Sequence, residues 1–170
     1  MILWFAGLSL VAMWVVFRDP AIDHRLVVVG ALLPDVLDGA IGQAAVGHSL
    51  AFAVALLFGV MGVTIGRRSL RRRVLAVPIG WFFHLVFDGV WSQTALFWWP
   101  LQGFDFPDVS VPAFDRPIGL VIVMEVVGLL TLAWAYRRFG LTDSARRTNF
   151  VRTGRIDRAL TDPDRSSPKC

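Results

Sequence analysis

The chain has almost no cysteine, almost no lysine and few polar stretches in its first 136 residues. Its one cysteine, Cys170, is the last of 170 residues, so no intrachain disulfide can form. Of the 17 basic residues only Lys169 is a lysine. The composition is 55% hydrophobic and the mean hydropathy is +0.59, which excludes an ordinary soluble domain of this size. The apolar residues fall in long runs, a pattern typical of a polytopic membrane protein.

Five apolar runs predict an all-α fold, a polytopic membrane helical bundle with about five membrane segments. We expect the second segment to be broken near Pro34, because proline removes a backbone hydrogen bond and disrupts a helix. Residues 1–139 would form the membrane-embedded helical domain. Residues 140–170 are polar and Arg-rich, and they predict a disordered tail. The five predicted segments are residues 1–17, 26–45, 48–66, 74–91 and 117–136.

The basic residues set the orientation. If the arginine-rich loop at 67–73 lies in the cytoplasm, every arginine and lysine except Arg116 falls on that side. Positive charge in cytoplasmic loops is the main determinant of membrane topology. We therefore expect a bacterial-type inner (plasma) membrane protein with a cytoplasmic C-terminal tail, a membrane lipid or lipid-linked substrate as its partner, and no nucleic-acid partner.

A few ionisable residues interrupt the apolar runs. A charged side chain inside a membrane span costs about 2.5–3.5 kcal/mol on insertion scales, so such residues are usually functional. His84 and Asp88 are four residues apart, and Asp35 and Asp38 three apart, so each pair shares a helix face. The predicted orientation places both pairs at overlapping depths, and His48 can join them if residues 39–47 fold inward. The predicted metal ligands are Asp35, Asp38, His48, His84 and Asp88.

This mixed nitrogen and oxygen donor set suits a divalent metal ion, zinc first, with manganese or iron as alternatives. A bound ion activates water and polarises a phosphoryl or acyl oxygen. The predicted function is therefore a membrane-bound metal-dependent hydrolase of a lipid-linked ester or phosphoester. Asp38 and Asp88 are the predicted catalytic residues, with Asp38 as the base, although Asp35 and Asp38 could exchange roles.

Other interpretations of the polar residues stay open. They could form a satisfied cluster holding three helices together, or line a small transporter, although no internal repeat is visible. Glu125 could join the cluster or pair with Arg116. His24 lies in a charged loop, where a solvated side chain is expected.

Four pieces of sequence follow one another between residues 26 and 104: residues 30–38, Gly47-His48-Ser49-Leu50, His84-Leu85-Val86-Phe87-Asp88, and Trp99-Pro100-Leu101. In their order and spacing the sequence resembles the YdjM-like family of inner-membrane metal-dependent hydrolases. The resemblance implies a membrane-embedded hydrolase with the same five residues as its polar set. The chain differs from many members in residues 43–47, where a further histidine and arginine are missing.

A second likeness concerns residues 35–43, which are similar to the opening of the CDP-alcohol phosphotransferase signature. Gly42-Gln43 stands where that signature has Ala-Arg, and Phe52, Leu56 and Val60 occupy its later places. The half that would complete that family's metal site is absent. This leaves a phosphotransferase as the alternative enzyme.

Overall fold

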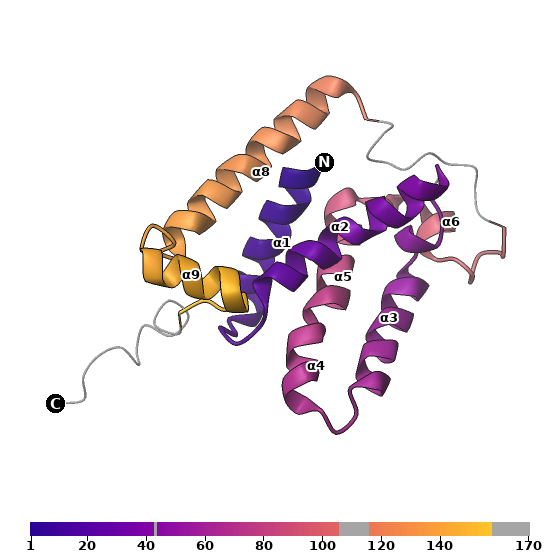
Figure 1. The fold of residues 1–170 in the computed structure, drawn as a ribbon. Helices are drawn as coiled ribbons and strands as arrows, with labels where there is room; N and C mark the ends of the chain where they lie inside the picture. Colours follow the sequence, from indigo (N-terminus) through magenta and orange to yellow (C-terminus); the bar gives the residue numbers. More distant parts are fainter. Residues whose placement is uncertain (43, 106–115, 158–170) are drawn as a thin grey trace.

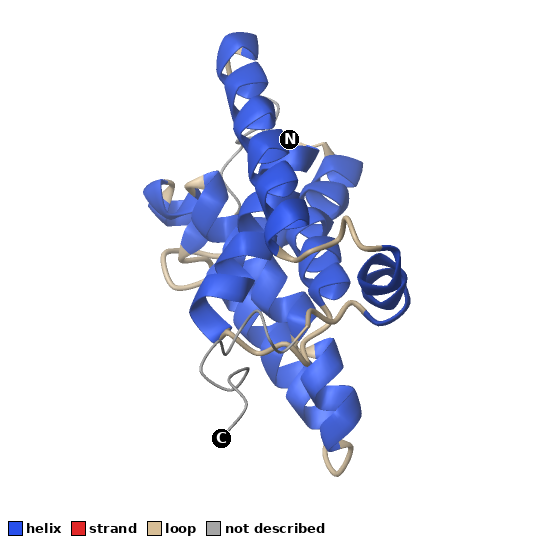
Figure 2. Ribbon diagram, turned by 90° about the vertical axis from the view of Figure 1, so that its left-hand side faces the viewer, coloured by secondary structure: helices blue, strands red, loops and turns tan. Residues whose placement is uncertain are grey.

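The computed structural model describes residues 1–42, 44–105 and 116–157, and within these ranges it contains helices and loops without a strand (Figures 1 and 2). The predicted all-α class is confirmed for this part of the chain. The helices are α1 (Ile2–Phe17), α2 (His24–Ile41), η1 (Val46–His48), α3 (Leu50–Val63), α4 (Arg68–Val74), α5 (Ala76–Asp88), η2 (Val90–Ser92), α6 (Thr94–Phe97), α8 (Ile118–Arg138) and α9 (Ser144–Thr153).

Helices α2 and α5 pack closely against each other at two glycines. A Cβ atom on Gly30 would collide with the backbone of Val77, and one on Gly80 with the backbone of Val27 and Ala31. Only glycine lets the two backbones approach this closely. α3 lies beside α5, and α8 lies along α1 (Figure 1). The α2–α5 contact brings Asp35 of α2 to His84 of α5.

The predicted break near Pro34 is wrong, because α2 runs through this proline to Ile41. Pro34 removes only the hydrogen bond to the carbonyl of Gly30, and packing against α5 supports the helix on both sides of that point. The chain turns instead at Gly42, whose φ of 85° lies in the left-handed region that favours glycine.

The region after residue 139 also differs from the prediction of a disordered tail. Asp143 caps α9 by accepting hydrogen bonds from the backbone N–H groups of Ala145 and Arg146. Phe150 and Ile156 pack with Leu10, Ala135 and Phe139, so α9 is docked on α1 and α8. The polar composition of this region predicted disorder, because Phe150 and Ile156 are two of the few apolar residues in a largely polar segment. Residues 158–170 of the predicted tail, Gln43 and part of the loop before Arg116 lie outside the described residues.

A buried polar group joins α9 to the start of α2; we name it the Asp23 cluster (Asp23, His24, Arg25, Arg73 and Gly154). Asp23 accepts hydrogen bonds from Arg25 and Arg73. The backbone N–H of His24 donates to the carbonyl of Gly154, and its ring Nδ1 donates to the same carbonyl at 3.1 Å. His24 is therefore only 2% exposed, and the expectation that it is solvated is wrong.

One helix, α8, is long and apolar enough to cross a membrane. α1 and α3 are apolar but shorter, and among the described residues no other helix meets the same test of length and hydropathy. The arrangement in five membrane segments stays a prediction.

Candidate metal centre

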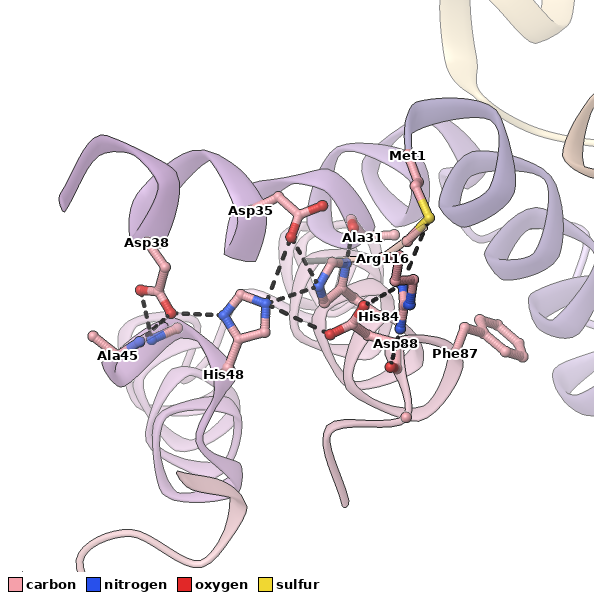
Figure 3. A network of polar contacts seen from close by, with 12 residues as sticks. Met1, Ala31, Asp35, Asp38, Ala45, His48, His84, Phe87, Asp88 and Arg116 are labelled. Atoms are coloured by element: carbon pink, nitrogen blue, oxygen red, sulfur yellow. Dashed lines mark hydrogen bonds and ion pairs between the residues drawn. The ribbon is translucent and has the colours of Figure 1, made fainter. Parts of the chain in front are cut away.

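Three side chains from three elements converge at one point: Asp35 from α2, His48 from η1 and His84 from α5 (Figure 3). Asp35 Oδ1 lies 3.5 Å from His48 Nε2 and 3.5 Å from His84 Nε2. The two Nε2 atoms are 3.3 Å apart. One ligand atom from each residue lies within 4.8 Å of the others, so this group could hold a metal ion.

The remaining ring nitrogens fix the tautomers of both histidines. Nδ1 of His84 lies 2.7 Å from the carbonyl oxygen of Ala31, which can only accept, so this nitrogen carries the hydrogen. Nδ1 of His48 lies 2.6 Å from Oδ2 of Asp38, an acceptor when ionised. In the neutral rings each Nε2 therefore presents a lone pair. Two lone pairs and a carboxylate oxygen face one another, and Asp35 Oδ1 is buried with no hydrogen-bond donor.

The triangle of acceptors fits a divalent cation. Zinc binds histidine nitrogen at about 2.0–2.1 Å and carboxylate oxygen at about 2.0–2.2 Å in tetrahedral geometry, which places neighbouring ligand atoms about 3.3–3.5 Å apart. The observed separations are 3.3, 3.5 and 3.5 Å. A cation would also satisfy the acceptors that no donor reaches.

Asp38 stands behind His48 and faces away from this triangle. Its carboxylate accepts hydrogen bonds from the backbone N–H groups of Ala45 at 2.8 Å and Gly47 at 3.1 Å, besides the imidazole of His48. A Cβ on Gly47 would lie 2.8 Å from Asp38 Oδ1, so glycine is needed there. Trp81 also fixes this loop by donating to the carbonyl of Gly47 at 2.8 Å.

The structure thus differs from the prediction that Asp38 binds the metal or acts as the base. Its oxygens already accept three hydrogen bonds, and they contact the side of the His48 ring opposite to Nε2. This arrangement orients the ring, a role that carboxylates commonly have behind metal-binding histidines.

Asp88, predicted as a ligand and a catalytic residue, lies at the edge of the centre at the end of α5. Its Oδ2 is 3.9 Å from His48 Nε2, farther than the members of the triangle are from one another. Its Oδ1 is 3.0 Å from the guanidinium of Arg116. Arg116 also donates to the main-chain carbonyl of Asp88 at 2.6 Å.

Sequence reasoning did not place Arg116 at the site. The one signal was its position as the only basic residue on the predicted outer side. Asp35, Asp38 and Asp88 contribute three negative charges, and Arg116 contributes one positive charge. The two negative charges that remain equal the charge of one divalent ion, which supports the same interpretation.

Glu125 lies outside the centre and does not pair with Arg116. Its carboxylate accepts a hydrogen bond from the backbone N–H of Leu3 at 3.0 Å and lies 3.9 Å from the amino group of Met1. It therefore joins α8 to the start of α1. Comparison of the chain with family models, curated proteins and solved structures gave no match.

Proposed function

We propose that this chain is an integral membrane protein that binds a divalent cation through Asp35, His48 and His84 and hydrolyses an ester or phosphoester of a membrane lipid. One observation carries the proposal. Asp35 Oδ1, His48 Nε2 and His84 Nε2 lie within 3.5 Å of one another, Asp35 Oδ1 is buried without a hydrogen-bond partner, and the contacts of both Nδ1 atoms leave each Nε2 of the neutral rings as an acceptor. Zinc is the proposed ion because two imidazole nitrogens and one carboxylate form the protein ligand set of many hydrolytic zinc sites.

The membrane assignment is supported by the apolar surface of several helices. In α3 the side chains of Phe58 and Val63 are 67% and 80% exposed, and in α8 those of Ile122 and Leu130 are 57% and 64% exposed. Exposed apolar side chains this numerous mark a surface that meets lipid or a partner. The proposed arrangement keeps five membrane segments, with the 67–73 region and the C-terminal segment in the cytoplasm.

The roles of the side chains follow from their contacts. A divalent ion held by the triangle would polarise a phosphoryl or acyl oxygen and make an adjacent water more acidic. Asp88 is placed to take the proton of the attacking water, because its Oδ2 accepts no hydrogen bond and lies 3.9 Å from His48 Nε2. Asp38 keeps the His48 ring in the tautomer whose Nε2 is free.

A lipid substrate is proposed because of the surroundings of the centre. Trp91 and Trp98 follow α5 directly and are 60% and 41% exposed, as expected for aromatic side chains at a membrane interface. The centre would then lie just below the headgroup level of the outer leaflet, within reach of an amphipathic molecule. Membership of the YdjM-like family, suggested by the motifs at 30–38, 47–50 and 84–88, belongs to this proposal.

The metal content of the purified protein tests the proposal. Wild type should carry about one divalent ion, and His84→Ala should lose it because one of three protein ligands is removed. His24→Ala is the matched control, since it removes a buried imidazole elsewhere in the fold. Equal metal content in wild type and His84→Ala would overturn the metal centre.

A second measurement tests catalysis. With a panel of lipid esters and phosphoesters in mixed micelles, Asp88→Asn should retain its metal and lose turnover. Metal-loaded wild type that cleaves no lipid in the panel would count against the hydrolase.

A further inference from the structure

The polar side chains of the centre differ in their access to the surface. Those of His48, His84 and Asp88 are fully buried. Those of Asp35 and Arg116 are each 18% exposed. A molecule that approaches the centre therefore meets one carboxylate, which faces the metal position, and one guanidinium.

Arg116 has hydrogen-bond donors to spare. A guanidinium carries five N–H groups in a rigid planar fork. NH2 donates to the carbonyl of Asp88, and NH1 faces both Asp88 Oδ1 and the sulfur of Met1 at 3.5 Å, a weak acceptor. Within the described ranges no acceptor lies at Nε. The fork can therefore bind a further oxyanion.

Asp88 connects Arg116 to the edge of the metal centre. Its carboxylate has Oδ1 at 3.0 Å from Arg116 and Oδ2 at 3.9 Å from His48 Nε2. A phosphoryl group carries several negatively charged non-bridging oxygens, so beside Asp88 one oxygen can face the remaining donors of Arg116 while another faces the triangle. The carbonyl of a carboxyl ester offers one uncharged oxygen and cannot bridge both.

We infer that Arg116 binds the phosphoryl group of the substrate, so that the bond cleaved is a phosphoester and not a carboxyl ester. This inference rests on the proposed function and names the substrate class of the same site. Hydrolysis breaks the bond between phosphorus and the ester oxygen. The water oxygen joins phosphorus, one proton of the water passes to Asp88, and Asp88 returns that proton to the leaving alkoxide, which departs as the lipid alcohol.

Inorganic phosphate is the probe for the binding step. Titration into the metal-loaded protein in detergent should show binding to wild type and about ten- to hundredfold weaker binding to Arg116→Gln, the loss expected for a charged hydrogen-bonded pair. The phosphate affinity of Arg116→Lys should lie between those of wild type and Arg116→Gln, because lysine keeps the charge without the planar fork. Arg146→Gln, on α9, is the control and should bind phosphate as wild type does.

Two results would overturn the inference. One is equal phosphate affinity in wild type and Arg116→Gln. The other is loss of the metal in Arg116→Gln, since weaker phosphate binding would then follow from the missing ion and not from the missing guanidinium.

Phosphatidic acid in mixed micelles tests the bond that is cleaved, since it contains both a phosphoester and carboxyl esters. Wild type should release inorganic phosphate, and Arg116→Gln should release it more slowly. Release of fatty acid in place of phosphate would overturn the inference while leaving a hydrolase. Phosphate binding that depends on Arg116, without turnover of any lipid, would overturn the proposed hydrolysis and support phosphoryl binding by Arg116.

Discussion

The molecule contains two buried groups of histidine and aspartate that differ in how their polar atoms are paired. In the Asp23 cluster, both carboxylate oxygens of Asp23 accept hydrogen bonds from arginines, and Nδ1 of His24 faces two carbonyl oxygens. In the metal centre, Oδ1 of Asp35 has no donor, although it lies 3.5 Å from two imidazole nitrogens. Each place contains a fully buried histidine beside an aspartate, with the Asp23 side chain 2% exposed and that of Asp35 18% exposed.

Whether the buried acceptor atoms have hydrogen-bond donors therefore distinguishes a group that only stabilises the fold from a group that could bind a ligand. A buried acceptor without a donor costs free energy, and folding does not normally leave several of them together. Where every acceptor is paired, as at Asp23, the group has no capacity for a ligand. Where acceptors face one another, as at Asp35, the group could hold a cation. The comparison predicts that equivalent substitutions in the two groups have different consequences.

The largest difference in metal affinity is expected between substitutions of Asp35 and Asp23. Asp35→Asn should weaken metal binding by more than about 100-fold, since it removes the charged ligand, whereas loss of a partner behind a ligand costs about 10–100-fold. Asp23→Asn should bind the metal as wild type does. Metal titration of both variants in detergent makes the measurement, and equal affinities would remove the distinction between the two groups.

A smaller effect is expected at Asp38. Asp38→Asn should weaken metal binding by about 10–100-fold, because the His48 ring loses its charged acceptor and its fixed tautomer. Asp143→Asn is a suitable control, since Asp143 also accepts two backbone N–H groups but lies at the start of α9. Metal competition with a chelator would measure the affinities. Complete loss of metal in Asp38→Asn would mean that Asp38 binds the ion directly.

The smallest effect concerns stability at the Asp23 cluster. Burial alone would raise the pKa of Asp23, but hydrogen bonds from Arg25 and Arg73 outweigh it, and the pKa lies below its ordinary value. The carboxylate therefore stabilises the fold above the unfolded pKa of about 3.9, and this contribution is lost as the pH falls through the lower folded value. Asp23→Asn should lower the free energy of unfolding at pH 7 by about 1 kcal/mol, a modest loss because both arginines are partly exposed.

Thermal unfolding of the metal-free protein between pH 7 and pH 3 measures this contribution. The midpoint of thermal unfolding, plotted against pH, should differ between wild type and Asp23→Asn at pH 7, and the two curves should converge in acid. A constant offset between wild type and Asp23→Asn down to pH 3 would contradict the assignment.

Hydropathy placed the long helices within a few residues, because runs of apolar side chains are a local property. A break in α2 was wrongly predicted at Pro34. A helix can continue through a single proline when it packs on a neighbour, as α2 packs on α5 at Gly30 and Gly80. α9 was missed for a similar reason. Its N-cap at Asp143 is local, but the burial of Phe150 and Ile156 depends on α1 and α8.

At the site, helix spacing and depth singled out Asp35 and His84, and His48 was expected to join them only if residues 39–47 folded inward. The structure brings the three together. The orientation of the carboxylates was not accessible from sequence. Asp35 and Asp38 are one helical turn apart on the same helix, yet one faces Nε2 of His48 and the other faces Nδ1. Arg116 was missed because its contact with Asp88 joins positions 28 residues apart through the tertiary fold.

The hydrogen bond between His24 and Gly154 joins residues 130 positions apart. During protein synthesis the start of α2 is complete long before Gly154 leaves the ribosome, since chains grow at about 5–20 residues per second. For those seconds the polar start of α2 has no cover from α9. A chain that stops before α9 never forms the contact between His24 and Gly154. In such a chain the polar start of α2 stays exposed, and the apolar residues of α1 and α8 that Phe150 and Ile156 cover stay exposed as well.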